Sequence, residues 1–373
     1  METSERHRDA EIGLLTEEVK SHHHFPSATK TTWRKAALTL VFFCLILGII
    51  FAFLHEDSIS IDNGNLTFGD DQPLDALSVQ RLPLNVLIVG DWGRKGLYNQ
   101  SQVARQMSRV GKELQADFIL STGDNFYDSG LKSVNDKSFE ESFTDVYHEK
   151  SLQKRWYAVL GNHDYRGNEE AQVDKSLNKR DPRWWCDYFY TIPYSVSPSS
   201  TVEFFMIDTN PFVEEYWTPD SEHYKWARPT PREEVMASTL ENLSSALEKS
   251  PATWKIVVGH HTMYSYGPHR NTPEIIEKVL PILEANKVDL YINGHDHCLE
   301  HIKRIDSDVH FVTSGGGSKA WKNEFLPGVQ QLPDVKLYYD GQGFISLSAS
   351  PTSVIINFFD INGKILHNLG LSK

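Results

Sequence analysis

The sequence has few cysteines and a deficit of basic side chains. Only three cysteines occur in 373 residues, which excludes a disulfide framework or a thiolate metal cluster as the organising feature. Cys44 lies in an apolar run, so one bridge between Cys186 and Cys298 is possible and is left open. With 37 basic against 50 acidic side chains, the net charge is −13. This balance argues against nucleic acid as a partner, because phosphate-backbone binders normally carry a basic surface.

Long apolar runs are also scarce, and only residues 36–54 form one. This segment has no charged residue and is long enough to cross the hydrocarbon core of a bilayer. Basic residues precede it and acidic residues follow it, which favours a cytoplasmic N-terminus. We therefore expect a transmembrane signal anchor in a single-pass type II membrane protein with a lumenal or extracellular body. Secretion after cleavage of a signal peptide is the alternative, although the run is longer than a typical signal-peptide core.

The remaining sequence divides around this span. Residues 1–35 are polar without periodicity and are expected to form a disordered cytoplasmic tail. Residues 55–81 are expected to be a linker and residues 82–373 the catalytic domain. Three acceptor patterns for N-glycosylation agree with an extracytoplasmic body. These patterns begin at Asn65, Asn99 and Asn242.

Five apolar segments typical of buried strands each lead through a short Gly-containing turn to a polar side chain. They are Leu87–Val89 before Asp91, Phe118–Leu120 before Asp124, Tyr157–Leu160 before Asn162, Ile256–Val258 before His260, and Leu290–Ile292 before His295. One polar residue after a strand is usually a cap or a turn residue. Five repeats have no explanation in packing, and the carboxyl ends of strands are where α/β sheets bind ligands.

Other segments show regular periodicity. The spacing of apolar residues predicts helices over 101–114, 231–250 and 273–287, and further strands over 309–313, 344–347 and 354–359. Residues 208–231 are rich in aromatics and proline and form either a rim of the site or a surface loop. The three glycines at 315–317 are interpreted as a tight passage under the site.

The donors at the strand ends are carboxylate, amide and imidazole. These groups bind metals of intermediate hardness, and thiolate is missing from the set. More donors are present than one open catalytic ion needs. Two ions about 3.5–4 Å apart, bridged by one carboxylate, would use them all.

The ordered motifs resemble the metallophosphoesterases, and among these the purple acid phosphatases of the low-molecular-weight, tartrate-resistant type. The resemblance covers residues 82–359. Most metallophosphoesterases open with Asp, any residue, His, whereas this chain has Gly93 at the third position. Tyr127, three residues after Asp124, is what purple acid phosphatases use in place of that histidine. The resemblance implies an α/β (α+β) fold, namely a four-layer αββα sandwich.

The resemblance also implies the roles of the site residues. It implies a ferric ion held by Asp91, Asp124, Tyr127 and His297, and a divalent ion (iron, zinc or manganese) held by Asp124, Asn162, His260 and His295. Asp124 would bridge the two ions. His163 and His269 match the two histidines of the family that hold the phosphate and protonate the leaving alcohol. Asp164 is expected to orient a neighbouring group, and His261 is expected to be a surface or core residue rather than a ligand.

The function implied is that of an acid phosphatase. It would hydrolyse phosphate monoesters by attack of a metal-bound hydroxide, without a phosphoenzyme. One alternative is another metallophosphoesterase activity on the same fold, such as a phosphodiesterase or a phosphoprotein phosphatase. A second is an ectodomain that binds metal without catalysis.

Overall fold

The computed structural model describes residues 83–221, 223–224, 226 and 228–373. The predicted tail, membrane span and linker, and the acceptor pattern at Asn65, lie outside these residues. Within the described ranges, no helix is both long enough and apolar enough to cross a bilayer. The membrane span and the domain boundaries therefore stay predictions.

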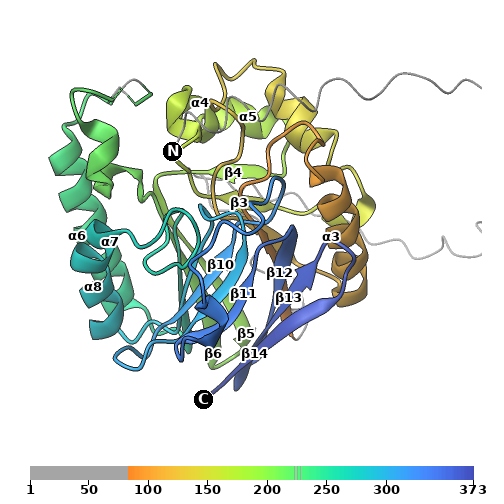
Figure 1. The fold of residues 1–373 in the computed structure, drawn as a ribbon, viewed down its shortest axis with the longest axis vertical. Coiled ribbons are helices and arrows are strands. Elements are labelled where there is room, and N and C mark those ends of the chain that lie inside the picture. Colours follow the sequence, from red (N-terminus) through yellow and green to blue (C-terminus); the bar gives the residue numbers. More distant parts are fainter. Residues whose placement is uncertain (1–82, 222, 225, 227) are drawn as a thin grey trace, which may run out of the picture. The chain divides into compact units, whose positions relative to one another are not determined.

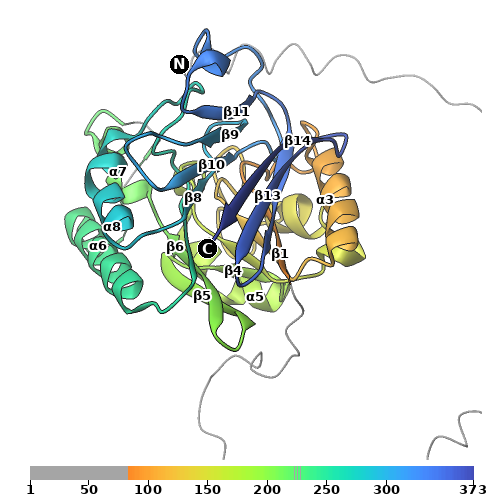
Figure 2. The same cartoon turned by 90° about the horizontal axis from the view of Figure 1, so that it is seen from below.

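Fourteen strands in the described part of the chain form two seven-stranded mixed sheets (Figures 1 and 2). The first sheet has the order β14 (Ile365–Ser372), β13 (Ser353–Asp360), β12 (Gly343–Ala349), β1 (Leu84–Val89), β2 (Phe118–Ser121), β3 (Trp156–Ala158) and β4 (Trp184–Cys186). The second has the order β11 (Val335–Tyr339), β9 (Leu299–Ile302), β10 (His310–Ser314), β8 (Leu290–Asn293), β7 (Trp254–Val258), β6 (Ser200–Ile207) and β5 (Phe189–Ser197). Strands β1 to β4 run parallel, and so do β6, β7, β8 and β10.

The helices flank the sheets. They are α3 (Gln100–Leu114), α4 (Glu170–Val173), α5 (Lys175–Arg180), α6 (Arg232–Lys249), α7 (Pro273–Lys278) and α8 (Leu280–Ala285). A π-helix spans Glu140–Thr144, and short 3₁₀ turns span Lys150–Leu152, Asp164–Arg166, Asn210–Phe212, Glu214–Trp217 and Val329–Gln331. The helices predicted over 101–114 and 231–250 are confirmed. The single helix predicted over 273–287 is wrong, because α7 ends at Lys278 and α8 begins with Pro281 in its first turn. Proline has no N–H for the helical ladder, so it starts a helix rather than continuing one.

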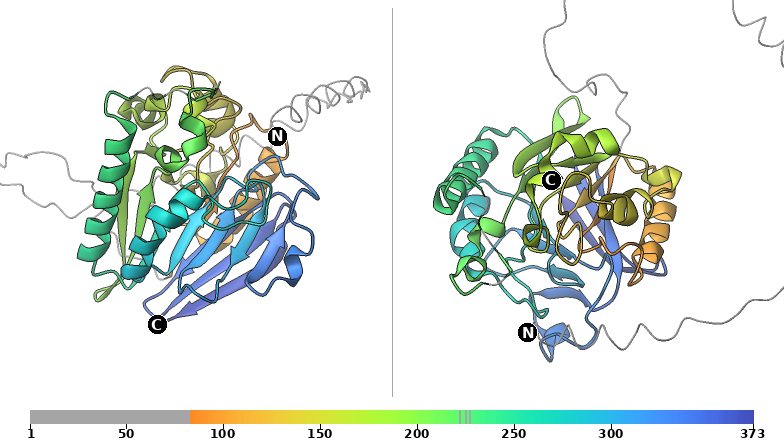
Figure 3. Two further views of the ribbon diagram at one scale, coloured as in Figure 1. Left: turned by 60° about the vertical axis from the view of Figure 1, so that its left-hand side comes forward. Right: turned by 90° about the horizontal axis from the view of Figure 1, so that it is seen from above.

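The two sheets pack face to face between two helical layers (Figure 3). Side chains alternate along β1: Val86 and Ile88 belong to the apolar core between the sheets, whereas Leu87 and Val89 belong to the core on the outer face of the first sheet. Helix α3 packs on that outer face. Helices α6, α7 and α8 cover the outer face of the second sheet, where Leu247 is fully buried. The layers therefore follow the order α, β, β, α, as the resemblance implied.

An aromatic cluster fixes the loop that follows β1. The Trp92 ring makes edge contacts with Phe126 at 5.5 Å and with Trp156 at 5.8 Å between centroids. Its indole Nε1 donates to Ser121 Oγ at 2.8 Å. Because Trp92 is fully buried, its neighbour Asp91 is held in place at the end of β1.

The two cysteines in the described part of the chain, Cys186 and Cys298, are both buried and free. The bridge that the sequence left open is therefore not formed. Burial in apolar surroundings raises the pKa of both thiols, so they stay protonated and unreactive at neutral pH.

Candidate metal centre

The structure brings the seven predicted ligands together at one end of both sheets. Asp91, Asp124 and Asn162 follow β1, β2 and β3 of the first sheet, and His260 and His295 follow β7 and β8 of the second. The backbone N–H of His295 donates to Asp91 Oδ2 at 3.0 Å, which joins the two halves directly. The expectation that five strand ends converge is therefore confirmed.

Three of these residues have a left-handed backbone. The φ angles are 59° at Asp91, 51° at Asp124 and 72° at His295. For residues with a Cβ this conformation is uncommon and costs about 1–3 kcal/mol each when the surroundings impose it. Such strain is concentrated at functional sites, because it aims side chains where ordinary turns would not.

The first cluster of donors surrounds the Tyr127 hydroxyl. Its oxygen lies 2.8 Å from Asp124 Oδ2, 3.1 Å from Asp91 Oδ1 and 3.0 Å from His297 Nε2. All four side chains are buried. Two carboxylates, a phenol and an imidazole from three segments of the chain thus converge on one point.

The second cluster surrounds the Asn162 side-chain oxygen. Asn162 Oδ1 lies 3.1 Å from His260 Nε2 and 3.0 Å from His295 Nδ1. His260 Nε2 is also 3.5 Å from Asp124 Oδ1. Asp124 therefore presents Oδ2 to the first cluster and Oδ1 to the second, which is the position of a bridging carboxylate.

The hydrogen bonds of His260 show what the second cluster lacks. Its Nδ1 lies 2.8 Å from the Thr122 carbonyl oxygen, which can only accept, so Nδ1 carries the proton. Burial lowers the pKa of His260 and keeps the ring neutral, so Nε2 presents a lone pair to Asn162 Oδ1 and Asp124 Oδ1. Three lone pairs that face one another with no proton between them fit a cation.

The carboxylates of the site lack a basic partner. Among the described residues, neither Asp91 nor Asp124 has an ion pair with Lys or Arg, and burial keeps the histidines that lie beside them neutral. Burial and the nearby Asp124 raise the pKa of Asp91, and burial with the two carboxylates raises the pKa of Tyr127. Burial also lowers the pKa of His297. Without a metal, the centre therefore keeps its charge low, and a metal would supply the missing positive charge.

Comparisons with known proteins agree with this geometry. The family of calcineurin-like phosphoesterases, named Metallophos, matches residues 84–299. Purple acid phosphatase 7 of Arabidopsis thaliana is 52% identical over 78% of this chain and 86% of that protein. The chain belongs to the purple acid phosphatases. Tartrate-resistant acid phosphatase type 5 of Oryctolagus cuniculus is 32% identical over 78% of this chain and 91% of its own.

Among solved structures, the chain is similar to "GAP50 the anchor in the inner membrane complex of Plasmodium". The TM-score is 0.66 at 26% identity, covering 78% of this chain and 89% of that one. Because that protein is called an anchor, the fold alone does not decide between catalysis and binding.

The two predicted non-ligand histidines lie next to the two clusters of this purple acid phosphatase. His163 contacts the Tyr127 ring at 4.4 Å, and its Nδ1 lies 2.6 Å from the Asp128 carbonyl oxygen. His269 is exposed and stacks on His295 at 4.0 Å. Its backbone N–H donates to Asp296 Oδ1 at 2.9 Å, so Asp296 fixes the loop that carries His269.

Two expectations about supporting residues are confirmed. Asp164 accepts backbone N–H groups from Asn125, Phe126 and Gly161 at 2.9–3.1 Å, so it ties the Asp124 loop to the Asn162 loop. A Cβ on Gly315 would lie 2.0 Å from the Asp296 carbonyl oxygen, so only glycine fits in this passage under the site.

His261 also behaves as predicted, as a packing residue. Its Nδ1 lies 2.8 Å from Thr209 Oγ1 and its Nε2 lies 3.1 Å from Tyr216 Oη. His261 forms a potential ligand group with His260 and His295. Because both of its ring nitrogens are already hydrogen-bonded, however, the geometry favours a packing role.

Sequence reasoning missed two aromatic residues at the site. The Trp321 ring lies flat on the His297 imidazole, with 3.9 Å between centroids and 10° between planes. The Tyr224 hydroxyl accepts a hydrogen bond from Asn162 Nδ2 at 3.0 Å. Tyr224 belongs to the aromatic-rich loop 208–231, so composition marked its segment but not its contact. Trp321 has no local signal, because it reaches the site from an irregular loop.

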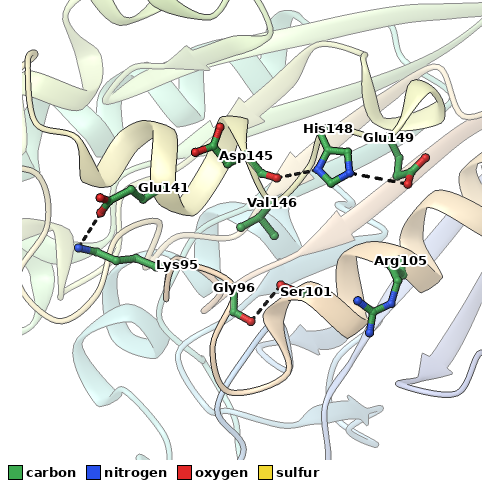
Figure 4. Close-up of a pocket in the computed structure, with 9 residues that line it drawn as sticks. All are labelled: Lys95, Gly96, Ser101, Arg105, Glu141, Asp145, Val146, His148 and Glu149. Atoms are coloured by element: carbon green, nitrogen blue, oxygen red, sulfur yellow. Dashed lines mark hydrogen bonds and ion pairs between the residues drawn. The ribbon is translucent and has the colours of Figure 1, made fainter. Parts of the chain in front are cut away.

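A polar hollow of about 430 Å³ lies beside the loop after β1, α3 and the π-helix (Figure 4). It contains none of the predicted site residues. Lys95 on its wall pairs with Glu141 at 2.8 Å, and His148 Nδ1 lies 2.6 Å from the Asp145 carbonyl oxygen. Because these groups are paired with one another, we assign no ligand to this hollow.

Proposed function

We propose that this protein is a phosphatase that hydrolyses phosphate monoesters through a binuclear Fe(III)–M(II) centre. The observation that supports this most strongly is that Asp124 faces two donor clusters with its two different oxygens. A single ion would leave one of these clusters without a cation. Two ions bridged by Asp124 satisfy both.

The donor chemistry assigns the two ions to different clusters. The phenol of Tyr127, together with Asp91 and His297, suits a hard ferric ion, and the phenol would be ionised on binding. The second cluster, with neutral imidazoles and an amide, suits iron, zinc or manganese in the divalent state. When bound, such a pair lowers the pKa of a coordinated water and neutralises the charge on phosphoryl oxygens.

The two flanking histidines supply the remaining functions. His163 is held by the Asp128 carbonyl oxygen and by its own backbone N–H, which donates to Asp124 Oδ1 at 2.8 Å. This position suits a group that binds a phosphoryl oxygen. His269, exposed beside the second cluster, is placed to donate a proton to the departing alcohol.

The visible spectrum and metal content of the purified protein test this proposal. A charge-transfer band is expected from Tyr127 on ferric iron, and Tyr127→Phe should remove it. Tyr190→Phe is the matched control, since its hydroxyl donates to the Ala158 carbonyl outside the centre. Asp124→Asn and His297→Ala should abolish hydrolysis and lower the metal content. Full activity in either variant would refute the ligand assignment.

Rates on monoester and diester model substrates separate the proposal from the other activities of the fold. We expect the monoester to be hydrolysed faster, and a faster diester reaction would favour a phosphodiesterase. The second alternative is an ectodomain that binds metal without catalysis. The similarity to GAP50, a protein called an anchor, is the observation that favours it. A purified protein that binds two ions and hydrolyses nothing would favour that alternative.

We further propose that residues 36–54 anchor the protein in a membrane, with the catalytic domain lumenal or extracellular. The uncharged length of this segment and the basic residues before it support the proposal. Asn99 and Asn242 are exposed and available for N-glycans on that side. Resistance to alkaline extraction, combined with a mass shift on glycosidase treatment, is the expected result. A freely soluble, unglycosylated product would contradict it.

A further inference from the structure

The aromatic-rich loop between β6 and α6 is fastened to the body of the protein at both ends. We call residues 208–231 the strap. Near its first end, Asn210 Nδ2 donates to the Leu160 carbonyl oxygen outside the strap at 3.0 Å. Near its last end, the Arg228 guanidinium donates to Asp208 Oδ2 at 2.6 Å and lies 3.5 Å from the centre of the Tyr188 ring. Cation–π stacking and a buried ion pair together hold this end.

Between these two ends, the strap carries Tyr224 to the second cluster. The Tyr224 ring stacks on Tyr216 at 4.3 Å with 22° between the planes. The Tyr224 hydroxyl accepts hydrogen bonds from Asn162 Nδ2 and from Arg166 Nε, both at 3.0 Å. Tyr224 is 9% exposed, so water competes little for this hydroxyl.

The contact matters because an amide has one oxygen and one nitrogen that can exchange places. In the observed orientation, Asn162 Oδ1 faces His260 Nε2 and His295 Nδ1. His260 Nε2 presents a lone pair, so in the absence of a cation the amide would gain a hydrogen bond by turning its NH₂ group toward His260. A turned amide offers N–H donors where a cation needs an oxygen. In the observed orientation the Tyr224 hydroxyl accepts from Nδ2 on the far side, which leaves Oδ1 facing the position of the metal.

We propose that Tyr224 is a positioning residue that holds the Asn162 amide with its oxygen toward the divalent ion, and that the strap exists to place it. This inference rests on the proposed function, because it assumes that the second cluster holds a divalent ion. Residues that orient metal ligands through hydrogen bonds typically change metal affinity by about 10- to 100-fold when they are removed. Tyr224→Phe keeps the ring and its stacking on Tyr216 and removes only the hydroxyl.

The test is a titration of the iron-loaded full chain with Zn²⁺. In Tyr224→Phe, the Kd for Zn²⁺ should rise about 10- to 100-fold, while the iron content and the visible absorption stay unchanged. Hydrolysis should recover at saturating Zn²⁺. Tyr188→Phe, which removes a hydroxyl from the ring under Arg228, is the matched control and should bind Zn²⁺ as the unsubstituted chain does.

A double-mutant cycle separates positioning from a general structural role. In Asn162→Asp the side chain has oxygen on both sides, so its orientation no longer matters. Adding Tyr224→Phe to that variant should then change the Zn²⁺ affinity less than it does in the unsubstituted chain. The inference would be overturned if Tyr224→Phe lowered the Zn²⁺ affinity equally in the unsubstituted chain and in Asn162→Asp. It would also be overturned if Tyr224→Phe alone left the Zn²⁺ affinity unchanged. If the unsubstituted chain binds iron but no second ion, the proposed function fails and the inference fails with it.

Discussion

Glu300 offers a quantitative test of the electrostatics around the centre. This carboxyl group lies on β9, is 1% exposed, and accepts the backbone N–H of Tyr266 at 3.1 Å through Oε1. Its Oε2 has no hydrogen-bond partner among the described residues. Tyr266 lies in the loop that carries His269. The perturbation is Glu300→Gln, which keeps the shape and the acceptor while removing the charge.

The direction and size of the effect follow from the pKa of Glu300. Burial and the nearby Asp296 raise this pKa from 4.5 to about 8. Between these two values the folded state binds one proton more than the unfolded state, so the free energy of unfolding falls as the pH rises. The slope is about 1.4 kcal/mol per pH unit. From about pH 5.5 to about pH 7, this group alone removes about 2 kcal/mol of stability.

Urea denaturation of both forms at several pH values measures the effect. Below the unfolded pKa the two forms should have similar stability, and toward pH 8 the Gln variant should become the more stable form. Metal binding also depends on pH, but it contributes equally to both forms and cancels in the difference. Glu241→Gln, at an exposed position of α6, is the control. Parallel stability curves for the Glu300→Gln and unsubstituted forms would refute the reasoning.

Three further predictions concern stability. Removing metal with a chelator should lower the midpoint of thermal unfolding, since an ion at about 100 times its Kd adds about 2.7 kcal/mol; an unchanged midpoint would contradict a bound metal. Leu247→Ala, in the core under α6, should cost about 2–5 kcal/mol in urea denaturation, whereas Leu97→Ala, 63% exposed, should cost little. Burial, with His310 beside it, lowers the pKa of His301 to about 3. Stability should therefore fall as the pH drops below 6.5, and His301→Gln should flatten that slope.

Five of the seven proposed ligands could be predicted from the sequence because each of the five has a local signal. Asp91, Asp124, Asn162, His260 and His295 all lie within four residues of the end of a buried strand, and parallel strands bring such ends to one edge of a sheet. Packing of the two sheets face to face then brings both edges together. The family resemblance added Tyr127 and His297, which strand periodicity alone does not mark.

Elements whose conformation depends on distant partners were not predictable. Strand β5 contains Pro193, which normally argues against a strand, but β5 is the edge strand of the second sheet and needs no donor on its outer side. Tyr224 and Trp321 reach the centre through loops whose paths are set by contacts far away in sequence. Such contacts leave no periodic pattern in the sequence, so local patterns marked most of the proposed ligands but not the aromatic residues beside them.

The centre concentrates unfavourable features that the rest of the fold must support. Three left-handed residues, two buried carboxyl groups without a basic partner and facing lone pairs at His260 each lower the stability of the metal-free protein. A cation would relieve the electrostatic part of this penalty but leave the backbone strain. Folding alone would favour replacing these residues, so their presence at one point is explained by what they bind. Strained donors stay in place only when their surroundings are rigid. The strap and the aromatic cluster around Trp92 provide such surroundings.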